Sequence, residues 1–261
     1  MSGFEADWLT LREPADRKAR ADDLLHAAAD HVASDEGPVI DLGCGTGSTF
    51  RALDPHLRRG TRWVFVDDDA ALLDRAADAL EERDRGRVVF RSIDLSGLTV
   101  DILAGARLVT ASALFDLVSE RFVSNFARML REARTGLYSA LTVDGRIEWG
   151  RPHEDDAAVA AAFSADQGRD KGFGPGLGGR AAEALEEALA REGFEIRSRE
   201  ADWHLGIDDL ALQDAFHAGF AEPARAELGD ERAGQWLQFR KNAARQGARL
   251  LVGHRDLLAL P

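Results

Sequence analysis

The sequence predicts an α/β protein with an open, mostly parallel sheet and helices on both of its faces. Between about residues 37 and 145, short apolar runs alternate with stretches of helical periodicity, the rhythm of parallel strands joined by helical crossovers. A glycine-rich loop at residues 43–47 follows the first apolar run and precedes a helix. No internal repeat or linker divides the chain, so residues 1–261 are expected to form a single domain with helical insertions.

Residues 1–36 are expected to form an N-terminal helical segment, because apolar positions recur at helical spacing between charged ones over residues 8–33. Buried strands are predicted at five apolar runs, which lie within residues 37–42, 61–69, 87–95, 106–118 and 136–150. Asp69 is suited to cap the helix that follows the second run. In the fifth run, Asp144-Gly145 fits a two-residue hairpin turn.

The alternation of strands and helices breaks after Gly150. Residues 150–180 combine a helical stretch with a glycine-rich loop, and they are predicted to insert as a lid. A helix that ends at Gly193 and a strand that begins near Phe194 follow. A helical insertion at residues 208–246 then precedes a last apolar strand at residues 248–260.

The composition disfavours several classes of partner. The formal net charge is −13, and the sequence shows no cluster of lysine and arginine with interleaved aromatic residues, so DNA binding is not expected. No apolar run approaches the roughly 18 residues of a membrane span, and the acidic N-terminus lacks the pattern of an export signal. The single cysteine, Cys44, fits a reducing cytoplasm, which is the expected location.

The first glycine cluster lies in VIDLGCGTG, residues 39–47, which has the strand–loop–helix context of a cofactor-binding loop. Glycines at positions 43, 45 and 47 let the backbone approach a ligand without a Cβ in the way. A dinucleotide site would need glycine where Ser48 stands, and Asp41 would face its anionic pyrophosphate. An acid at this position favours a ligand with a cationic group, which disfavours an NAD(P) oxidoreductase.

This stretch resembles the nucleotide-loop motif of the class I S-adenosylmethionine (SAM) dependent methyltransferases, and the resemblance extends over roughly residues 37–145. It implies a seven-stranded sheet whose last strand is antiparallel, with SAM as methyl donor and S-adenosylhomocysteine (SAH) as product. By this resemblance Asp41 serves the amino-acid part of SAM, Asp67 the ribose and Asp94 the adenine. The cofactor-binding residues that it implies are Asp41, Gly43, Cys44, Gly45, Gly47, Asp67, Asp68, Asp94, Leu95 and Ser112.

Some of these acids have other interpretations. Asp94 fits a simple loop acid nearly as well as an adenine contact, and Asp68 has no assigned role. A metal site at residues 67–69 is not expected, because neighbours on a strand point to opposite faces. The fourth strand carries TASALFDL in place of the N/D-P-P-Y/F segment of methyltransferases that modify bases, which further disfavours DNA.

Methyl transfer needs an acceptor atom aligned with the methyl group, and a base helps when that atom must lose a proton. The candidate bases are Asp116, just after the fourth strand, and His153, after the fifth. If neither is catalytic, Asp116 is a solvated acid at a helix start and His153 is a surface histidine. Trp149 is a candidate wall of the acceptor cavity, although large aromatic residues more often belong to cores.

A second glycine cluster, DKGFGPGLGG at residues 170–179, matches the spacing G-x-G-x-x-G but follows a helical pattern rather than a strand. It is therefore not expected to hold the cofactor. Its place at the carboxyl edge of the sheet favours a lid in which Lys171 and Phe173 contact the acceptor. A plain surface connector fits this segment equally well.

The predicted function is transfer of a methyl group from SAM to an oxygen or nitrogen atom of a small molecule. One alternative is a protein that binds SAM or SAH without catalysis. Another is a methyltransferase that acts on protein or RNA, which the lack of a basic cluster disfavours. The sequence indicates neither the identity of the acceptor nor the oligomeric state.

Overall fold

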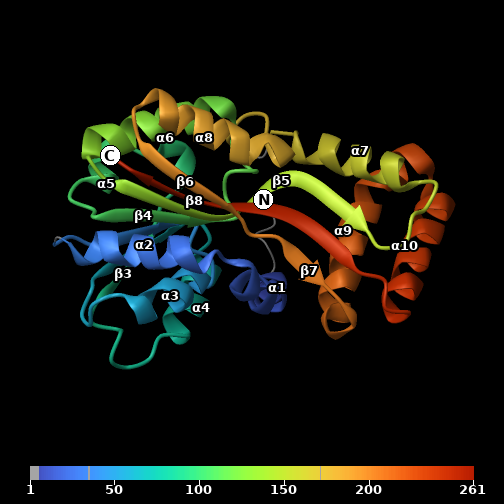
Figure 1. The fold of residues 1–261 in the computed structure, drawn as a ribbon, viewed down its shortest axis with the longest axis horizontal. Coiled ribbons are helices and arrows are strands. Elements are labelled where there is room, and N and C mark those ends of the chain that lie inside the picture. Colours follow the sequence, from blue (N-terminus) through green and yellow to red (C-terminus); the bar gives the residue numbers. More distant parts are fainter. Residues whose placement is uncertain (1–5, 35, 171) are drawn as a thin grey trace.

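The computed structural model describes residues 6–34, 36–170 and 172–261. Within them, eight strands form one mixed sheet in the order β3-β2-β1-β4-β5-β8-β6, with β7 paired to β8 (Figure 1). The strands are β1 (Val39–Leu42), β2 (Trp63–Asp67), β3 (Val88–Ser92), β4 (Leu108–Ser112), β5 (Gly136–Trp149), β6 (Glu195–Glu200), β7 (Trp203–Leu205) and β8 (Leu250–Leu260). Strands β1 to β5 pair in parallel, whereas β8 is antiparallel to β5 and β6. The predicted sheet with an antiparallel last strand is confirmed, and the short β7 adds to it.

Helices cover both faces of the sheet. They are α1 (Ala6–Ala19), α2 (Asp22–Ala33), α3 (Ser48–Leu53), α4 (Ala70–Asp78), α5 (Val100–Leu103), α6 (Glu120–Ala133), α7 (Asp156–Gln167), α8 (Ala181–Arg191), α9 (Leu210–Leu228) and α10 (Asp230–Arg245). Figure 1 shows α5, α6 and α8 on one face and α2, α3 and α4 on the other. The first group packs an apolar core around Phe126 and Leu185, and the second packs another around Leu25 and Phe50. In the described part of the chain, no helix has both the length and the apolar character that a membrane crossing requires.

The N-terminal segment is helical, but it consists of two helices. The chain turns between α1 and α2 at Ala21, whose backbone is extended and whose amide donates to Oδ2 of Asp256 at 3.0 Å. Helix α2 then contacts β4, β6 and β8, whereas α1 contacts β7 and α9. The helical pattern over residues 8–33 therefore corresponds to two helices, and a buried carboxylate from the far end of the chain binds the amide at their junction.

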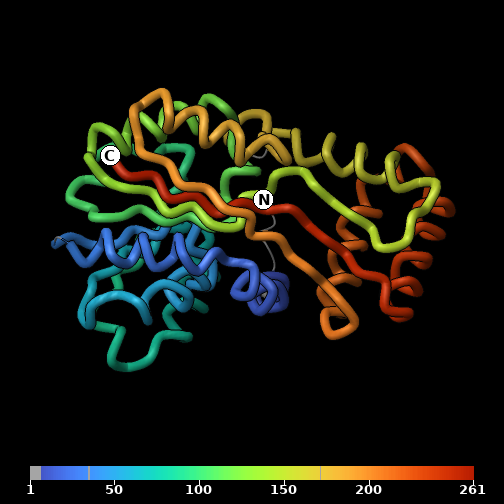
Figure 2. The backbone as a smooth tube through the Cα atoms, viewed as in Figure 1, coloured from blue at the N-terminus to red at the C-terminus, as the bar shows by residue number. Residues whose placement is uncertain are grey.

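Strands β5 and β8 are long, and their paired outer halves project beyond the carboxyl ends of the other strands, towards α7, α9 and α10 (Figure 2). The predicted hairpin is wrong, since Asp144 and Gly145 lie inside β5, where its register with β8 shifts between Val143 and Ile147. Gly145 has a φ of +84°. A Cβ added to Gly179 would lie only 2.7 Å from the Cα of Gly145. The Asp-Gly pair thus forms an irregularity within a strand, against which a second glycine segment packs closely.

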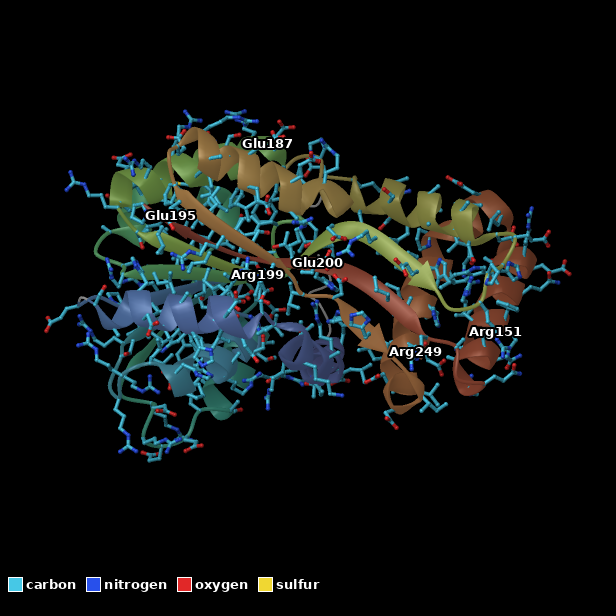
Figure 3. All side chains as sticks on the ribbon, in the orientation of Figure 1. Arg151, Glu187, Glu195, Arg199, Glu200 and Arg249 are labelled. Atoms are coloured by element: carbon cyan, nitrogen blue, oxygen red, sulfur yellow. The ribbon has the colours of Figure 1, made fainter. Side chains whose placement is uncertain are left out.

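Strand β6 is an edge strand with charged side chains along it (Figure 3). Glu195, Arg199 and Glu200 are exposed, and Nε of Arg199 donates to Asp23 of α2 at 2.9 Å. Charged side chains on an edge strand oppose its pairing with another chain.

Candidate active site

The loop between β1 and α3 is built from glycines that no other residue can replace without strain. Gly43, Gly45 and Gly47 have φ values of +62°, +53° and +83°, a region that favours glycine. A Cβ on Gly45 would lie 3.1 Å from Cδ1 of Leu9, and a Cβ on Gly47 would lie 3.1 Å from the Phe65 ring. The predicted sharp, glycine-lined turn between a strand and a helix is confirmed.

Asp41 is a buried carboxylate immediately before this loop, with an exposed fraction of 1%. Its Oδ1 accepts a hydrogen bond from Oγ1 of Thr110 at 2.7 Å. Its Oδ2 is buried and makes no hydrogen bond with any described residue. Burial raises the pKa of Asp41 to about 7. An unsatisfied buried carboxylate oxygen is costly, and a cationic ligand group would satisfy it.

The three acids at the end of β2, residues 67–69, have different environments. Asp67 is buried; its Oδ2 accepts from the amide of Gly45 at 2.8 Å and its Oδ1 from the amide of Asp69 at 3.1 Å. Burial raises the pKa of Asp67. Asp68 is exposed, and Asp69 caps α4 by accepting from the amide of Ala71 at 2.9 Å, which confirms its predicted role. Among the described residues, no group of three or more His, Cys, Asp or Glu is arranged to hold a metal ion.

The remaining predicted cofactor contacts are partly engaged by the protein itself. Asp94, after β3, is exposed, and its Oδ1 accepts from the amide of Ser96 at 2.8 Å, in agreement with the loop-acid interpretation. Leu95 is buried in the core beside α5 and α6. Cys44 is a buried residue of the glycine loop, and its amide donates to the carbonyl of Val66 at 3.1 Å. The adenine contacts of Asp94 and Leu95 therefore stay predictions.

Helix α1 lies across the glycine loop, a feature that the sequence reasoning missed. Glu13 accepts from Nε of Arg51 at 2.7 Å, and Nη1 of Arg51 donates to the carbonyl of Thr46 at 2.6 Å. At the end of α1, Nη2 of Arg20 donates to Oγ of Ser112 at 3.2 Å. Three charged residues of this region, spaced four apart, are buried: Arg12, Asp16 and Arg20. The spacing of four residues places them on one face of the helix, and only the tertiary structure shows that this face is covered.

Asp116 lies at the same edge of the sheet, half-buried in the connection from β4 to α6. The carbonyl of Asp116 accepts from the amide of Gly178 at 2.9 Å, which ties this connection to the second glycine cluster. Ala113, three residues earlier, has a φ of +49°. The predicted base is therefore placed at the carboxyl end of β4 by a sharply turned backbone.

The structure does not bring His153 to this edge. The β5 residue paired with the end of β4 is Ala140, and β5 continues for nine residues to Trp149, about 30 Å along an extended strand. His153 follows that end, where its Nδ1 accepts from the amide of Asp155 at 3.1 Å and its ring lies 4.7 Å from that of Phe239. His153 thus packs against α10, away from the glycine loop.

The second glycine cluster packs against the connection after β4. The amide of Leu177 donates to the carbonyl of Val118 at 3.0 Å. The Phe173 ring lies 5.4 Å from the ring of Phe122, at the start of α6. Lys171 lies outside the described residues. The segment thus covers the carboxyl edge beside Asp116, as both the lid and the connector interpretations require.

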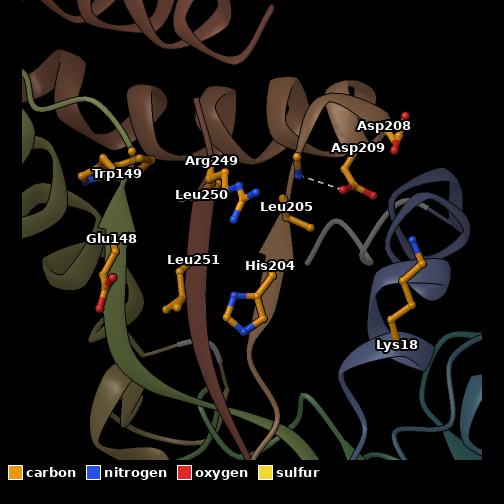
Figure 4. Close-up of a pocket in the computed structure, with 12 residues that line it drawn as sticks. Lys18, Glu148, Trp149, His204, Leu205, Asp208, Asp209, Arg249, Leu250 and Leu251 are labelled. Atoms are coloured by element: carbon orange, nitrogen blue, oxygen red, sulfur yellow. Dashed lines mark hydrogen bonds between the residues drawn. The ribbon is translucent and has the colours of Figure 1, made fainter. Parts of the chain in front are cut away.

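A cavity of about 590 Å³ lies along the outer halves of β5, β7 and β8 (Figure 4). Trp149 lines it, and Glu148, Leu251 and His204 form a row across the three strands. The guanidinium of Arg240 lies 4.5 Å from the Trp149 ring, so this tryptophan also belongs to the core of the extension. Among the described residues that line the cavity, none belongs to the glycine loop. Trp149 is therefore a cavity residue, but not of the glycine-loop site.

Comparison with known proteins identifies the kind of domain. A family profile described as a methyltransferase domain matches residues 40–147. The cyclopropane synthase MmaA2 from Mycobacterium tuberculosis is 14% identical, with a TM-score of 0.51 over 91% of this chain and 83% of that one. The YcgJ protein from Bacillus subtilis is 12% identical, with a TM-score of 0.53 over 91% and 96%.

The mycolic acid cyclopropane synthase CmaA1, in a complex with SAH, is 12% identical, with a TM-score of 0.51 over 91% of this chain and 83% of that one. No curated protein matches the sequence. At these identities the solved structures show a shared fold, and the family profile shows the type of domain that the fold carries.

Proposed function

We propose, on the premise that residues 40–147 form a class I SAM-dependent methyltransferase domain, that the chain transfers a methyl group from SAM to an oxygen or nitrogen atom of a small molecule. The proposal rests on one observation: the unsatisfied Oδ2 of Asp41 lies next to a loop whose glycines place no side chain between the backbone and a ligand. This combination suits a ligand with a cationic amino-acid group, and it does not suit a pyrophosphate.

The residues at the loop fit SAM. The backbone of residues 43–47 would lie beneath the ligand, and Asp41 would accept from its ammonium group. Each carboxylate oxygen of Asp67 already accepts one amide and has a further lone pair for a ribose hydroxyl. When bound, SAM supplies a methyl group activated by its sulfonium.

Residues after β4 would align the acceptor atom with the methyl group and take up the proton that the acceptor loses. Asp116 is half-buried at the carboxyl edge, so its carboxylate is suited to take the proton from an acceptor hydroxyl or amine. The segment from Phe173 to Gly178 packs beside it and would exclude water from the acceptor.

A small acceptor is supported by the charge of the chain. A net charge of −13 opposes long-range attraction of nucleic acid, which disfavours RNA as the acceptor. The single, buried Cys44 is compatible with a cytoplasmic location. A protein that binds SAM without catalysis would have the same glycine loop, so turnover decides between these functions.

The first test is calorimetry of the purified chain with SAM, SAH and NADH. Binding of both sulfur compounds and not of NADH is expected, and the absence of SAM and SAH binding would overturn the proposal. Transfer of labelled methyl to a metabolite extract then distinguishes an enzyme from a binding protein. In that assay Asp116→Asn should lower turnover by about 10²–10⁴-fold without changing SAH affinity, whereas the control His153→Ala should leave both unchanged.

A further inference from the structure

The cavity along the outer halves of β5, β7 and β8 takes no part in the proposed methyl transfer. Its volume, about 590 Å³, lies within the range of sites for small molecules. The described residues that line it all lie outside residues 40–147, which the family profile matches. Trp149, in its wall, is nine residues beyond Ala140, or about 30 Å along an extended strand. A small molecule in this cavity would therefore lie away from the glycine loop.

Arg249, directly before β8, has an exposed side chain with open space beside it. The amide of Gly150 donates to the carbonyl of Arg249 at 2.7 Å, and the register of β7 with β8 places Gly206 on the other side. A Cβ added to Gly206 would meet no atom within 4 Å. The side chain of Arg249 makes no hydrogen bond or ion pair with any described residue. Its planar fork of N–H donors is thus available to a ligand.

Two further donors border this space from other elements (Figure 4). Lys18 is in the last turn of α1, and His204 of β7 pairs with Leu251, two residues after Arg249. His204 and Arg249 therefore lie on the same face of the sheet. The side chains of Lys18 and His204 are exposed, and neither bonds to a described residue. Because even a neutral imidazole has one N–H donor, three donor groups from three elements favour an anionic ligand group.

The acids that line the cavity limit the charge of such a ligand. Asp209 is engaged within the protein, since its Oδ2 accepts from the amide of Gly206 at 2.9 Å. Figure 4 shows Asp208 beyond Asp209, on the side away from Arg249, and it shows the Glu148 carboxylate directed away from Arg249. These acids would repel a polyanion such as nucleic acid. They leave one place for a single anionic group, beside the guanidinium.

We propose that this cavity binds a small organic anion, a carboxylate or a phosphate ester with an apolar body, at a site separate from those of SAM and the methyl acceptor. The guanidinium of Arg249 binds the anionic group with two parallel hydrogen bonds, and Lys18 and His204 add further donors. The partly exposed Leu251 and Trp149 offer apolar surface to the rest of the ligand. The proposal goes beyond the proposed function and does not depend on it. We call this place the Arg249 site.

Four probes that share one aromatic ring and differ in charge test the Arg249 site. They are benzoate, phenyl phosphate, the neutral benzamide and the cationic benzylamine. Binding is followed by the chemical shifts of the backbone amides of Gly206 and Leu251 in ¹H–¹⁵N spectra of the full chain. At least one of the two anions is expected to shift these amides saturably, and to bind about tenfold more tightly than benzamide. The tighter anion identifies the ligand as a carboxylate or a phosphate ester.

Two variants remove different parts of the site. Arg249→Met removes the donors at a similar side-chain length and should weaken binding of the tighter anion by about tenfold. Gly206→Leu fills the open space and should abolish it; the backbone of Gly206 is extended, with a φ of −126°, so leucine fits there without strain. The matched control is Arg59→Met, which removes the same charge from an exposed position before β2 and should leave binding unchanged.

Loss of anion binding in both variants, with the control unchanged, supports the Arg249 site. Tighter binding of benzylamine than of either anion would assign the cavity to cations and overturn the proposal. Unchanged anion binding in Arg249→Met, displacement of the anion by SAH, or no saturable shift with either anion would also overturn it. Calorimetry with SAH on the same samples reports the proposed function separately, because no described residue of the cavity belongs to the glycine loop.

Discussion

Asp41→Asn is expected to stabilise the protein by an amount that grows with pH. Asp41 is almost fully buried, and burial raises its pKa from 3.8 to about 7. A carboxyl group with a raised pKa binds its proton more tightly in the folded state than in the unfolded state. The unsubstituted protein therefore loses stability through this group as the pH rises from about 4 to about 7. Asparagine has nearly the same shape and does not ionise, so it does not incur this loss.

The magnitude follows from a shift of about three pH units. One unit corresponds to about 1.4 kcal/mol, so Asp41 lowers the free energy of unfolding by about 2 kcal/mol at pH 5 and about 4 kcal/mol at pH 8. The stability difference between the variant and the unsubstituted protein should therefore grow by about 2–3 kcal/mol over this range. Asp67 and Asp256, whose pKa values burial also raises, are present in both proteins and largely cancel from the difference.

The measurement is urea denaturation, followed by tryptophan fluorescence at pH 5, 6.5 and 8. Asp78→Asn, at an exposed position in α4, is the control and should show the same difference at each pH. A stability difference for Asp41→Asn that does not change with pH would refute the reasoning. It would mean that the folded protein stabilises the ionised carboxylate as well as water does.

Three further predictions concern the loop and the second glycine cluster. SAH affinity should rise with pH through about 7, because only ionised Asp41 attracts the ligand ammonium; calorimetry on Asp41→Asn should give a flat profile, and a parallel rise would contradict this. Asp67→Ala should weaken SAH binding by about 1–3 kcal/mol, and unchanged binding would exclude it as a ribose contact. Gly179→Ala should lower the melting temperature, since its Cβ would lie 2.7 Å from Cα of Gly145. By contrast, Gly219→Ala, in an open helical position, should stabilise by about 0.5–1 kcal/mol, and equal effects would argue against the close contact.

Features of the site that depend on local chain properties could be predicted from the sequence. The turn at residues 43–47 needs positive φ angles, which glycine adopts freely, so three spaced glycines after an apolar run are informative. The cap by Asp69 involves amides two and three residues away, within the reach of a short carboxylate. The order of strands and helices likewise follows from apolar periodicity.

Features that depend on distant segments could not be predicted. Asp144-Gly145 has the local signature of a hairpin, but β8 pairs on both sides of it and Gly179 packs against it, so the strand continues. His153 follows a strand, but the length of β5 carries it away from the carboxyl edge. Arg20 looks like a solvated residue at a helix end until Ser112 and Asp256 are placed beside it.

The sequence by itself determined the type of domain, the glycine turn at residues 43–47 and the acids at the strand ends, since these depend on backbone conformation and short-range hydrogen bonds. Only the tertiary structure decided which charges are buried and which of them lack a partner. Burial depends on what the rest of the chain places around a residue, and a buried charge is unsatisfied only when every neighbour has been placed. The unpaired oxygen of Asp41 is a product of the fold, and the proposed function rests on it.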